Sequence, residues 1–433
     1  MFRRRWSSLP KDASFPSSLK GLGYFINDAD EVRSIEKPDC YFKYFANHNM
    51  RVNERQRFAF NRALEKIVHE RLEEEGLAKM TLPRGASPSE KHAPIFTTPD
   101  IESSPRVIVI FGEPTTDLGI LSYRIANGPG GLDRGSMVNA VRTIAKHAAS
   151  TDDSNSPGIV LANMGQRYWW PEGKRALTIS ASGDTPLPSL VHSGTQYVPS
   201  LNAIAGSETP LQHMETIFSE VLEKLPNRKA KIDVIAIGES CEVVQTFFDN
   251  KTHWDSWSDR LNGMVLFGTV FGTEMLMNDS FREFLAQRTR GYLLSEDPLD
   301  TPLAPPSGNP SLAIEALGCP CYSSSEPLNT EVIAVRALDP ALSFLQDVSM
   351  TPGFVNSPIT VVERPRADFR PDEWDSVAEE NKPPVHTVDN EAMLQQVKQL
   401  RRWRKFEQTG EAPDSESSDD EDKDVPLGDD AWV

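Results

Sequence analysis

The sequence predicts an α/β protein whose mostly parallel sheet is covered by helices on both faces. Continuous apolar runs, such as residues 106–111 (RVIVIF) and 231–237 (KIDVIAI), are typical of strands that are buried on both sides. Stretches with the apolar spacing of helices lie between these runs. Because right-handed crossovers place such helices on the two faces of one sheet, the alternation predicts a layered domain.

The first 82 residues form an N-terminal segment that we expect to belong to the same domain. Its main element is a helix over Asn53–Glu75, in which Asn53 and Gln56 have the spacing of a capping box and apolar residues recur along one face. Residues 83–105 are rich in Pro, Ser and Thr. They predict a long loop without regular structure.

The core extends over residues 106–364, because beyond 364 the chain gains proline and loses aliphatic residues. A Thr209 cap followed by Pro210 marks the start of one of its helices. The predicted elements are strand 106–111, helix 136–149, strand 158–164, helix 209–225, strand 231–237, a helix that ends at 248, strand 261–271, helix 280–287 and strand 291–295.

Residues 365–433 predict a mostly disordered tail that contains one helix near 389–406. The helix ends in cations, which the helix dipole favours at this end. These residues could meet a partner groove, RNA or the chain's own domain. The candidate interaction residues are Arg401, Arg402, Trp403 and Arg404.

Near the end of the tail, residues 411–424 hold eight acidic residues and one lysine, and such a run repels itself and stays solvated. Ser417 and Ser418 each precede an acidic residue by three positions, the spacing that acidophilic kinases prefer. Phosphate at these serines would make the segment more negative and favour an Arg-rich partner. Both serines are therefore candidate phosphorylation sites.

Composition limits the classes of function. Lys and Arg total 45 against 63 Asp and Glu, a net charge of −18, which argues against a broad basic surface that follows a nucleic-acid backbone. Any RNA contact is therefore expected to be local or made by a partner. No apolar run approaches the roughly 20 residues of a membrane span, so no membrane insertion is expected.

The chain also lacks signals for cofactors, metals and disulfides. Its four cysteines are too few for a disulfide framework, so a reducing compartment is expected. Cys319 and Cys321 form a C-x-C without further ligands nearby, which favours two buried thiols over a zinc site. Glycine-rich phosphate-binding motifs do not occur, so neither a cofactor nor a metal is expected.

The segment after the 231–237 strand carries a motif that resembles a catalytic one. Gly238-x-Ser240 places a serine on a turn between a buried strand and a helix, as in the nucleophile elbow of α/β-hydrolases. The second glycine of G-x-S-x-G is replaced by Glu242. Asp297 and Asp300, after a late strand, stand where the acid of such a fold belongs.

The base of a catalytic triad is missing from the expected place. The loop that should carry a histidine, over residues 319–329, has none, and Glu113 would bring negative charge to the oxyanion site. We therefore expect a catalytically silent α/β-hydrolase-like protein in which Ser240, Asp297 and Asp300 are vestigial. A serine esterase-like hydrolase that uses Ser240 is the alternative.

Several segments resemble the fungal Argonaute-binding protein family, the second subunit of the Argonaute siRNA chaperone complex. The match is densest near the N-terminus and extends over about residues 10–350. The segments that carry it are MFRRRW (1–6), LPKD (9–12), LKGLGYFIN (19–27), EVRSI (31–35), YFKYF (41–45), NERQR (53–57), RGS (134–136), the Gly238-x-Ser240 elbow, DPLDT (297–301) and GCPC (318–321).

The resemblance implies an α/β-hydrolase-like domain that is also found at the C-terminus of fungal class II histone deacetylases. It implies a scaffold or chaperone subunit that binds Argonaute and a companion subunit in siRNA-mediated heterochromatin formation. It further implies a place in nucleus and cytoplasm and a link to histone deacetylase machinery.

Overall fold

The computed structural model describes residues 8–99, 101–151, 153–192, 196–225, 227, 229–268, 276–359 and 361. The chain divides into two units, Met1–Arg364 and Pro365–Val433. The second unit lies outside the described residues. The 389–406 helix, its basic end at 401–404 and the serines 417 and 418 therefore stay predictions.

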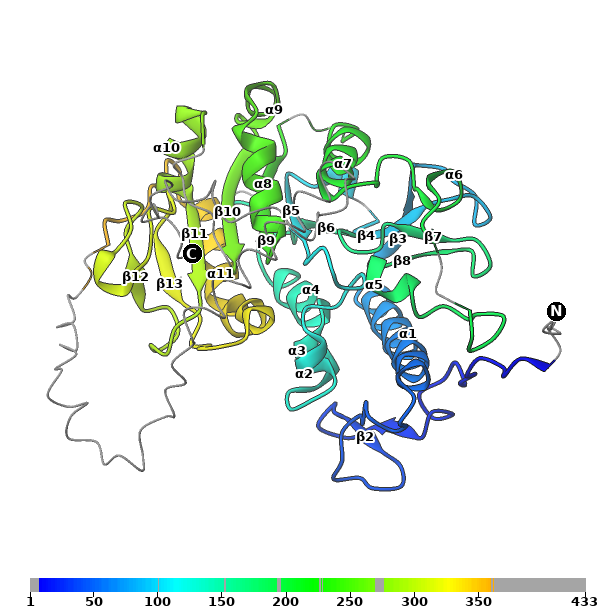
Figure 1. The fold of residues 1–433 in the computed structure, drawn as a ribbon. Helices are drawn as coiled ribbons and strands as arrows, with labels where there is room; N and C mark the ends of the chain where they lie inside the picture. Colours follow the sequence, from blue (N-terminus) through cyan, green and yellow to red (C-terminus); the bar gives the residue numbers. More distant parts are fainter. Residues whose placement is uncertain are drawn as a thin grey trace, which may run out of the picture. The chain divides into compact units, whose positions relative to one another are not determined.

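A nine-stranded sheet forms the centre of the first unit (Figure 1). Its strands are β3 (Ala78–Leu82), β4 (Ala93–Thr97), β5 (Arg106–Phe111), β6 (Gly158–Ala162), β9 (Lys231–Ile237), β10 (Leu261–Phe267), β11 (Thr289–Leu293), β12 (Pro302–Ala304) and β13 (Cys321–Ser323). They lie in the order β12-β13-β11-β10-β9-β5-β6-β4-β3. The neighbours from β13 to β6 run parallel, and β12, β4 and β3 pair antiparallel.

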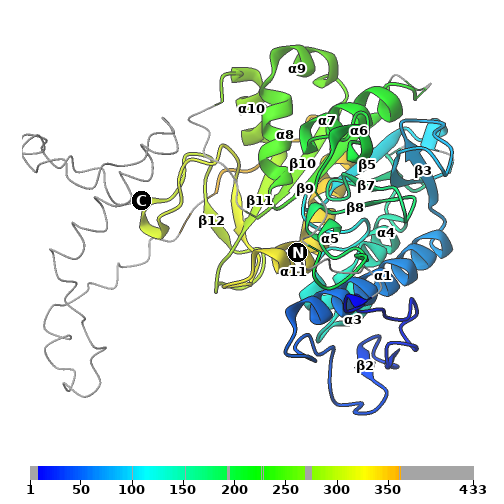
Figure 2. The ribbon, with the colours of Figure 1, turned by 45° about the vertical axis from the view of Figure 1, so that its right-hand side comes forward.

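Helices cover both faces of the sheet, as the alternation predicts (Figure 2). One face carries α1 (Met50–Glu74), α4 (Val138–Ile144) and α11 (Ile333–Met350). The other carries α7 (Pro210–Thr216), the π-helix η3 (Ile217–Leu222), α8 (Ser240–Asp249), α9 (Lys251–Trp257) and α10 (Asp279–Arg288). Along β5, Ile108 and Ile110 pack on the first face, and Val107 and Val109 on the second. A mostly parallel α/β sheet is thus confirmed.

Shorter elements surround the sheet. The hairpin of β7 and β8, together with α5 and α6, is inserted between β6 and α7. Of the described helices, none is long and apolar enough to cross a membrane. These elements are β1 (Tyr24–Ile26), β2 (Val32–Ser34), β7 (Tyr168–Trp170), β8 (Arg175–Leu177), α2 (Tyr123–Ala126), α3 (Gly131–Gly135), α5 (Ile179–Ser182), α6 (Pro199–Asn202) and the 3₁₀ turns η2 (Ile101–Ser103), η5 (Pro310–Leu312) and η6 (Thr330–Val332).

The first long helix begins earlier than its sequence predicts. Asn49 is its N-cap, and the Asn49 side chain accepts a hydrogen bond from the backbone N–H of Arg51. Asn53, the predicted cap, is buried within α1, where its side-chain oxygen accepts from the N–H groups of Ala46 and Asn47. Asn53 therefore fixes the preceding segment to the helix instead of starting it.

The 83–105 stretch is not a loop throughout, which corrects the prediction. It contains β4, which pairs with β3 along its length and with β6 at its end. Pro94 has no N–H to donate, and it lies before Phe96, where the pairing of β4 with β6 begins, so only β3 borders the strand at this residue. Its carbonyl oxygen accepts a hydrogen bond from the Asn163 side chain. Pairing with β3 and with β6, which is distant in sequence, thus makes a strand of a segment without a local strand signal.

Other boundaries differ from the predicted ones by a few residues or more. The predicted helix 136–149 is helical as α4 only at Val138–Ile144, and the predicted strand 291–295 is β11 at Thr289–Leu293. The predicted helix 209–225 is divided into α7 and η3. Helix α11 has no counterpart among the predicted elements.

Candidate functional site

The turn between β9 and α8 is where the sequence places its candidate nucleophile. In a nucleophile elbow, the nucleophile itself occupies the strained position of the strand-to-helix turn. Gly238 holds that position here, with φ of 60°, in the left-handed region that favours glycine. Ser240 comes two residues later, as the first residue of α8.

Ser240 is fully buried, and its hydroxyl donates a hydrogen bond to the Gly112 carbonyl oxygen at 2.6 Å. This bond joins the start of α8 to the loop after β5. Sequence reasoning aligned Gly238 with the first glycine of G-x-S-x-G. The small residues Ala236, Gly238 and Ser240 have the same spacing as that motif and could have indicated the shifted register.

Glu113, from the loop after β5, occupies the space beside the turn. Its Oε2 accepts a hydrogen bond from the backbone N–H of Glu239 at 3.2 Å. A Cβ atom added to Gly238 would lie 1.4 Å from the same oxygen. The carboxylate of Glu113 thus fills the volume of a nucleophile side chain and also takes the N–H that follows it.

That N–H has a defined role in hydrolases of this fold, where the residue after the nucleophile contributes to the oxyanion hole. In this protein a carboxylate is bound there instead. Burial raises the pKa of Glu113 to about 7, and the charge of Glu239 adds to the rise although its N–H counteracts it. The carboxylate predicted to lie near this site is therefore in contact with it.

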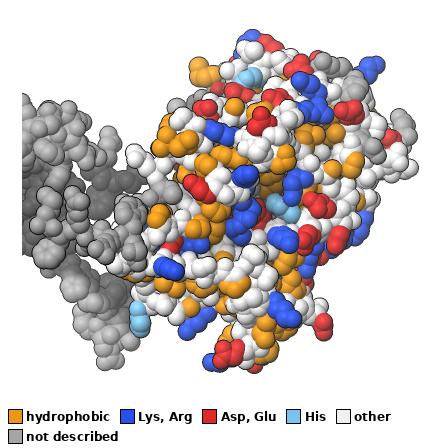
Figure 3. All heavy atoms as spheres, turned by 90° about the vertical axis from the view of Figure 1, so that its right-hand side faces the viewer, with side chains coloured by type: hydrophobic (Ala, Val, Ile, Leu, Met, Phe, Trp, Pro, Cys, Tyr) orange, Lys and Arg blue, Asp and Glu red, His pale blue; other side chains and the backbone are white. Residues whose placement is uncertain are grey.

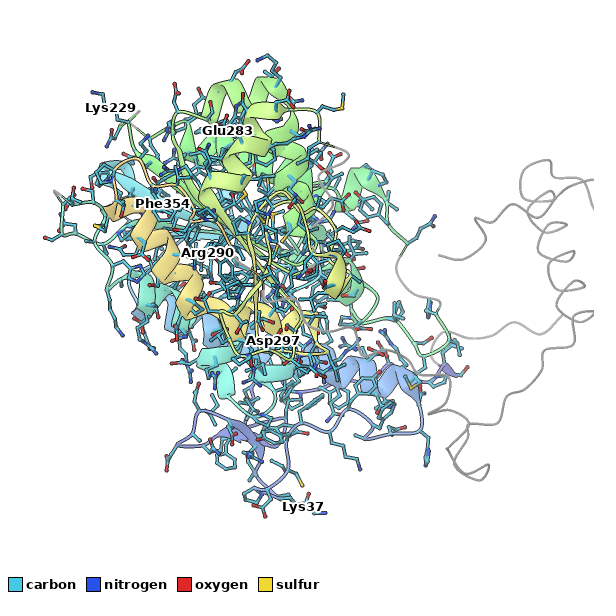
Figure 4. The ribbon with its side chains drawn as sticks, turned by 90° about the vertical axis from the view of Figure 1, so that its left-hand side faces the viewer. Lys37, Lys229, Glu283, Arg290, Asp297 and Phe354 are labelled. Atoms are coloured by element: carbon cyan, nitrogen blue, oxygen red, sulfur yellow. The ribbon has the colours of Figure 1, made fainter. Side chains whose placement is uncertain are left out.

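The two candidate acids lie in the loop after β11 and bond to their own surroundings. The hydroxyl of Ser295 donates to Asp297 Oδ2 at 3.2 Å, and Tyr292 donates to Asp300 Oδ1 at 2.9 Å. Arg290 Nη1 lies 3.8 Å from Asp300 Oδ1. Figure 4 shows Arg290 and Asp297 on this side of the molecule. Ser240 bonds to a different loop, so the described contacts of Ser240 and Asp300 do not join them into a relay.

The loop after β13, where the fold would place a base, carries a carboxylate. Glu326 Oε1 accepts from the backbone N–H and the side-chain amide of Asn329 at 3.1 and 3.0 Å. Ser324 donates to the Leu293 carbonyl oxygen at 2.7 Å. The first two bonds lie within the loop after β13, and the third joins this loop to the end of β11.

A serine–histidine pair that sequence reasoning missed lies elsewhere. Ser207 Oγ and His213 Nδ1 are 2.9 Å apart, and both side chains are fully buried. His213 Nε2 accepts from the N–H of Asn163 at 3.1 Å, so in the neutral ring Nδ1 carries the proton and donates to Ser207. The ring nitrogen that faces Ser207 is therefore already protonated and cannot accept a proton from that serine.

The cysteines of the C-x-C motif are buried at the start of β13. Cys319 and Cys321 are both fully buried, and the Cys321 thiol donates to the Cys319 carbonyl oxygen at 3.4 Å. Its hydrogen bond with Cys319 and burial raise the pKa of Cys321 well above its usual value, which keeps it a thiol. Within the described part of the chain, no group of three or more His, Cys, Asp or Glu residues is placed to hold a metal ion.

A cavity of about 710 Å³ lies between α1, α2, α5 and the loop after β5. Thr115, two residues after Glu113 in that loop, lines the cavity. The cavity thus adjoins the occupied turn at the carboxyl end of β5, the edge at which open α/β sheets bind their ligands.

A family model described as the Arb2 domain matches residues 15–299 of the chain. The match begins in the N-terminal segment, includes the turn with Gly238 and Ser240, and ends beyond Asp297. It covers more than half of the chain. A search of curated proteins finds no match.

Proposed function

This chain belongs to the Argonaute-binding (Arb2) family, and from that premise we propose that it is a non-catalytic subunit that binds Argonaute. Its partners in this proposal are Argonaute and a companion subunit of an siRNA chaperone complex. The complex serves siRNA-mediated heterochromatin formation, in contact with histone deacetylase machinery. The protein acts in both nucleus and cytoplasm.

One observation supports the non-catalytic role above all others. The backbone position of a nucleophile belongs to Gly238, which has no side chain to attack a substrate. The oxyanion-hole N–H of Glu239 is taken by Glu113, and negative charge there opposes the charge that develops during acyl transfer. The same turn would need at least two coordinated changes before it could act as an elbow.

Contact with RNA through Argonaute, rather than directly, is supported by charge. The net charge of −18 opposes association with a polyphosphate over any large area. A protein partner that itself binds RNA removes this difficulty, because only the partner must neutralise the phosphates.

Affinity purification of the tagged full-length protein at native levels tests the proposal. We expect Argonaute and a companion subunit in the eluate of the wild type, in RNase-treated as well as untreated samples. Ser240→Ala is the informative variant, because it removes the hydroxyl of the alternative hydrolase. Circular dichroism of the variant checks its fold, since the lost bond to Gly112 costs about 1 kcal/mol.

Equal recovery of Argonaute by wild type and folded Ser240→Ala supports binding without chemistry. Absence of Argonaute from the wild-type eluate contradicts the proposed role. Ester hydrolysis by the wild type that disappears in folded Ser240→Ala would instead establish the serine hydrolase.

A further inference from the structure

One charged side chain in the lining of the cavity beside the occupied turn lacks a close partner. Most of the charged side chains that face it hold a close partner of their own. These pairs are Arg57 with Glu54 at 2.5 Å, Glu65 with Arg175 at 2.5 Å, Arg124 with Glu331 at 2.8 Å, and Asp184 with Arg57 at 3.5 Å. They leave little net charge to attract a ligand.

Asp117, another lining residue, is also fully engaged. Its Oδ1 accepts from the Gln166 amide at 2.8 Å, and its Oδ2 accepts from the Tyr123 hydroxyl. Glu65 accepts from the same amide, at 2.7 Å, in addition to its pair with Arg175. The carboxylates nearest this part of the cavity are therefore bound to partners within the protein.

Arg62 is the exception. Its Nη1 atom is buried and has no hydrogen-bond partner among the described residues. The nearest charged oxygen is Glu65 Oε2, at 3.9 Å, too far for a hydrogen bond. Burial and the charge of Arg175 lower the pKa of Arg62, so its surroundings disfavour the cation as it stands. The Arg62 side chain as a whole is 31% exposed, but a buried N–H donor such as Nη1 is costly unless a ligand supplies an acceptor.

Two further features of the lining restrict the ligand. Asn127 Oδ1 is buried without a donor among the described residues, so the ligand should carry a hydroxyl or amine. The rings of Phe42 and Phe58 and the side chain of Leu177 line the same cavity, which suits an apolar or aromatic body. The volume of about 710 Å³ is that of a site for a small molecule.

We propose that this cavity binds a small aromatic anion, a carboxylate or a phosphate monoester, with its anionic group on Arg62 and a hydrogen-bond donor on Asn127. The proposed site does not depend on the proposed function. A guanidinium recognises both anions by charge-assisted hydrogen bonds, so the chemistry is shared.

Isothermal titration calorimetry on the full-length protein tests the site. The probes are 4-hydroxyphenylacetate and 4-hydroxyphenyl phosphate, whose comparison distinguishes carboxylate from phosphate, and the neutral 4-hydroxyphenylacetamide. We expect at least one anion to bind about tenfold or more tightly than the amide, because the charge-assisted bond to Arg62 is lost in the amide.

Arg62→Gln should weaken binding of that anion by about tenfold or more, and Arg62→Lys by less. Arg124→Gln is the matched control, because Arg124 lines the same cavity but is paired with Glu331 and is 60% exposed. It should leave the affinity unchanged. The unfolding curve of Arg62→Gln without ligand confirms that this variant is folded.

A second hollow, of about 550 Å³, also contains Arg62 and must be distinguished. It opens on the face that carries α1, where Lys and Arg side chains gather (Figure 3), and Lys66 and Lys79 line it. Lys79→Gln should not change the affinity if the anion lies in the cavity. Weakening by Lys79→Gln, equal binding of anion and amide, full binding by Arg62→Gln, or no binding of either anion to the wild type would each overturn the proposal.

Discussion

Arg106 and Asp233 form an ion pair in the middle of the sheet, with Arg106 Nε donating to Asp233 Oδ2 at 2.6 Å. The two side chains come from the adjacent strands β5 and β9 and are almost completely buried. Asn262 donates to the other oxygen of Asp233, and the guanidinium of Arg106 also donates to the Leu345 carbonyl oxygen and to Gln346. The pair therefore connects the strand of the turn to α11.

Replacing Asp233 by Ala should lower the free energy of unfolding more than most single substitutions do. It leaves the Arg106 charge buried without a counter-ion, which costs about 3–5 kcal/mol. Urea unfolding at neutral pH measures the loss. Asp255→Ala, which removes one partner of the exposed pair with Lys251, is the control and should have little effect. A similar midpoint for both variants would show that the buried pair contributes little.

Gly238→Ala should destabilise the protein through two separable effects. The first is backbone strain at φ of 60°, and the second is the clash with Glu113 Oε2. Gly76→Ala isolates the first effect, because Gly76 has φ of 91° and nothing within 4 Å of an added Cβ. We expect about 1–2 kcal/mol for Gly76→Ala and more for Gly238→Ala, as measured by urea unfolding.

The double variant Gly238→Ala/Glu113→Ala completes the cycle. With the carboxylate gone, the added methyl group has room, so the extra cost of Gly238→Ala should shrink toward that of Gly76→Ala. Strictly additive losses would show that Glu113 does not fill the nucleophile volume in solution.

The sequence predicts those elements whose signal is local. Strands 106–111 and 231–237 were predicted at their observed bounds, because a continuous apolar run marks a buried parallel strand. Helix 209–225 was placed correctly at its start, where Thr209 and Gln212 form a capping box. Its change to a π-helix at Ile217 has no such local mark.

Elements that depend on distant partners were missed or misplaced. Strand β4 exists through its pairing with β3 and β6, and α4 ends at Ile144 although apolar residues continue beyond it. The turn was found, but its register was not, because glycine can serve either as the first small residue of an elbow or at its strained position. Only the backbone angle at Gly238 and the contact of Glu113 decide between these roles.

His213 should make stability fall in acid. Burial lowers its pKa to about 4 from a usual 6.5, with a contribution from the charge of Arg167. The unfolded chain therefore takes up a proton below about pH 6.5 that the folded ring refuses, and stability is lost as the pH falls toward 4.

His213→Gln should be less stable than the wild type at neutral pH, since the buried bonds to Ser207 and Asn163 are disturbed. The difference in urea midpoint should narrow between pH 6.5 and 4, because the variant lacks the titrating ring. His48→Gln, at an exposed position, serves as the control. A difference that stays constant over this range would contradict a neutral buried imidazole.

Glu113 should have the opposite effect, a loss of stability as the pH rises. Its pKa is raised from 4.5 to about 7, so between these values the unfolded chain releases a proton that the folded state retains. Since the unfolded state then binds fewer protons, the free energy of unfolding decreases with pH across this window. Below the window, Glu113 does not change the free energy of unfolding with pH.

Glu113→Gln keeps an oxygen for the N–H of Glu239 but cannot ionise. Urea midpoints of the variant relative to the wild type should therefore increase from pH 4.5 to 7, whereas Glu283→Gln, which removes an exposed carboxyl group of α10, should show no such trend. If the urea midpoint of Glu113→Gln instead falls relative to the wild type as the pH rises, the ionised carboxylate stabilises the turn. The oxyanion site would then be a strong anion-binding site and not one in which the charge of Glu113 is destabilising.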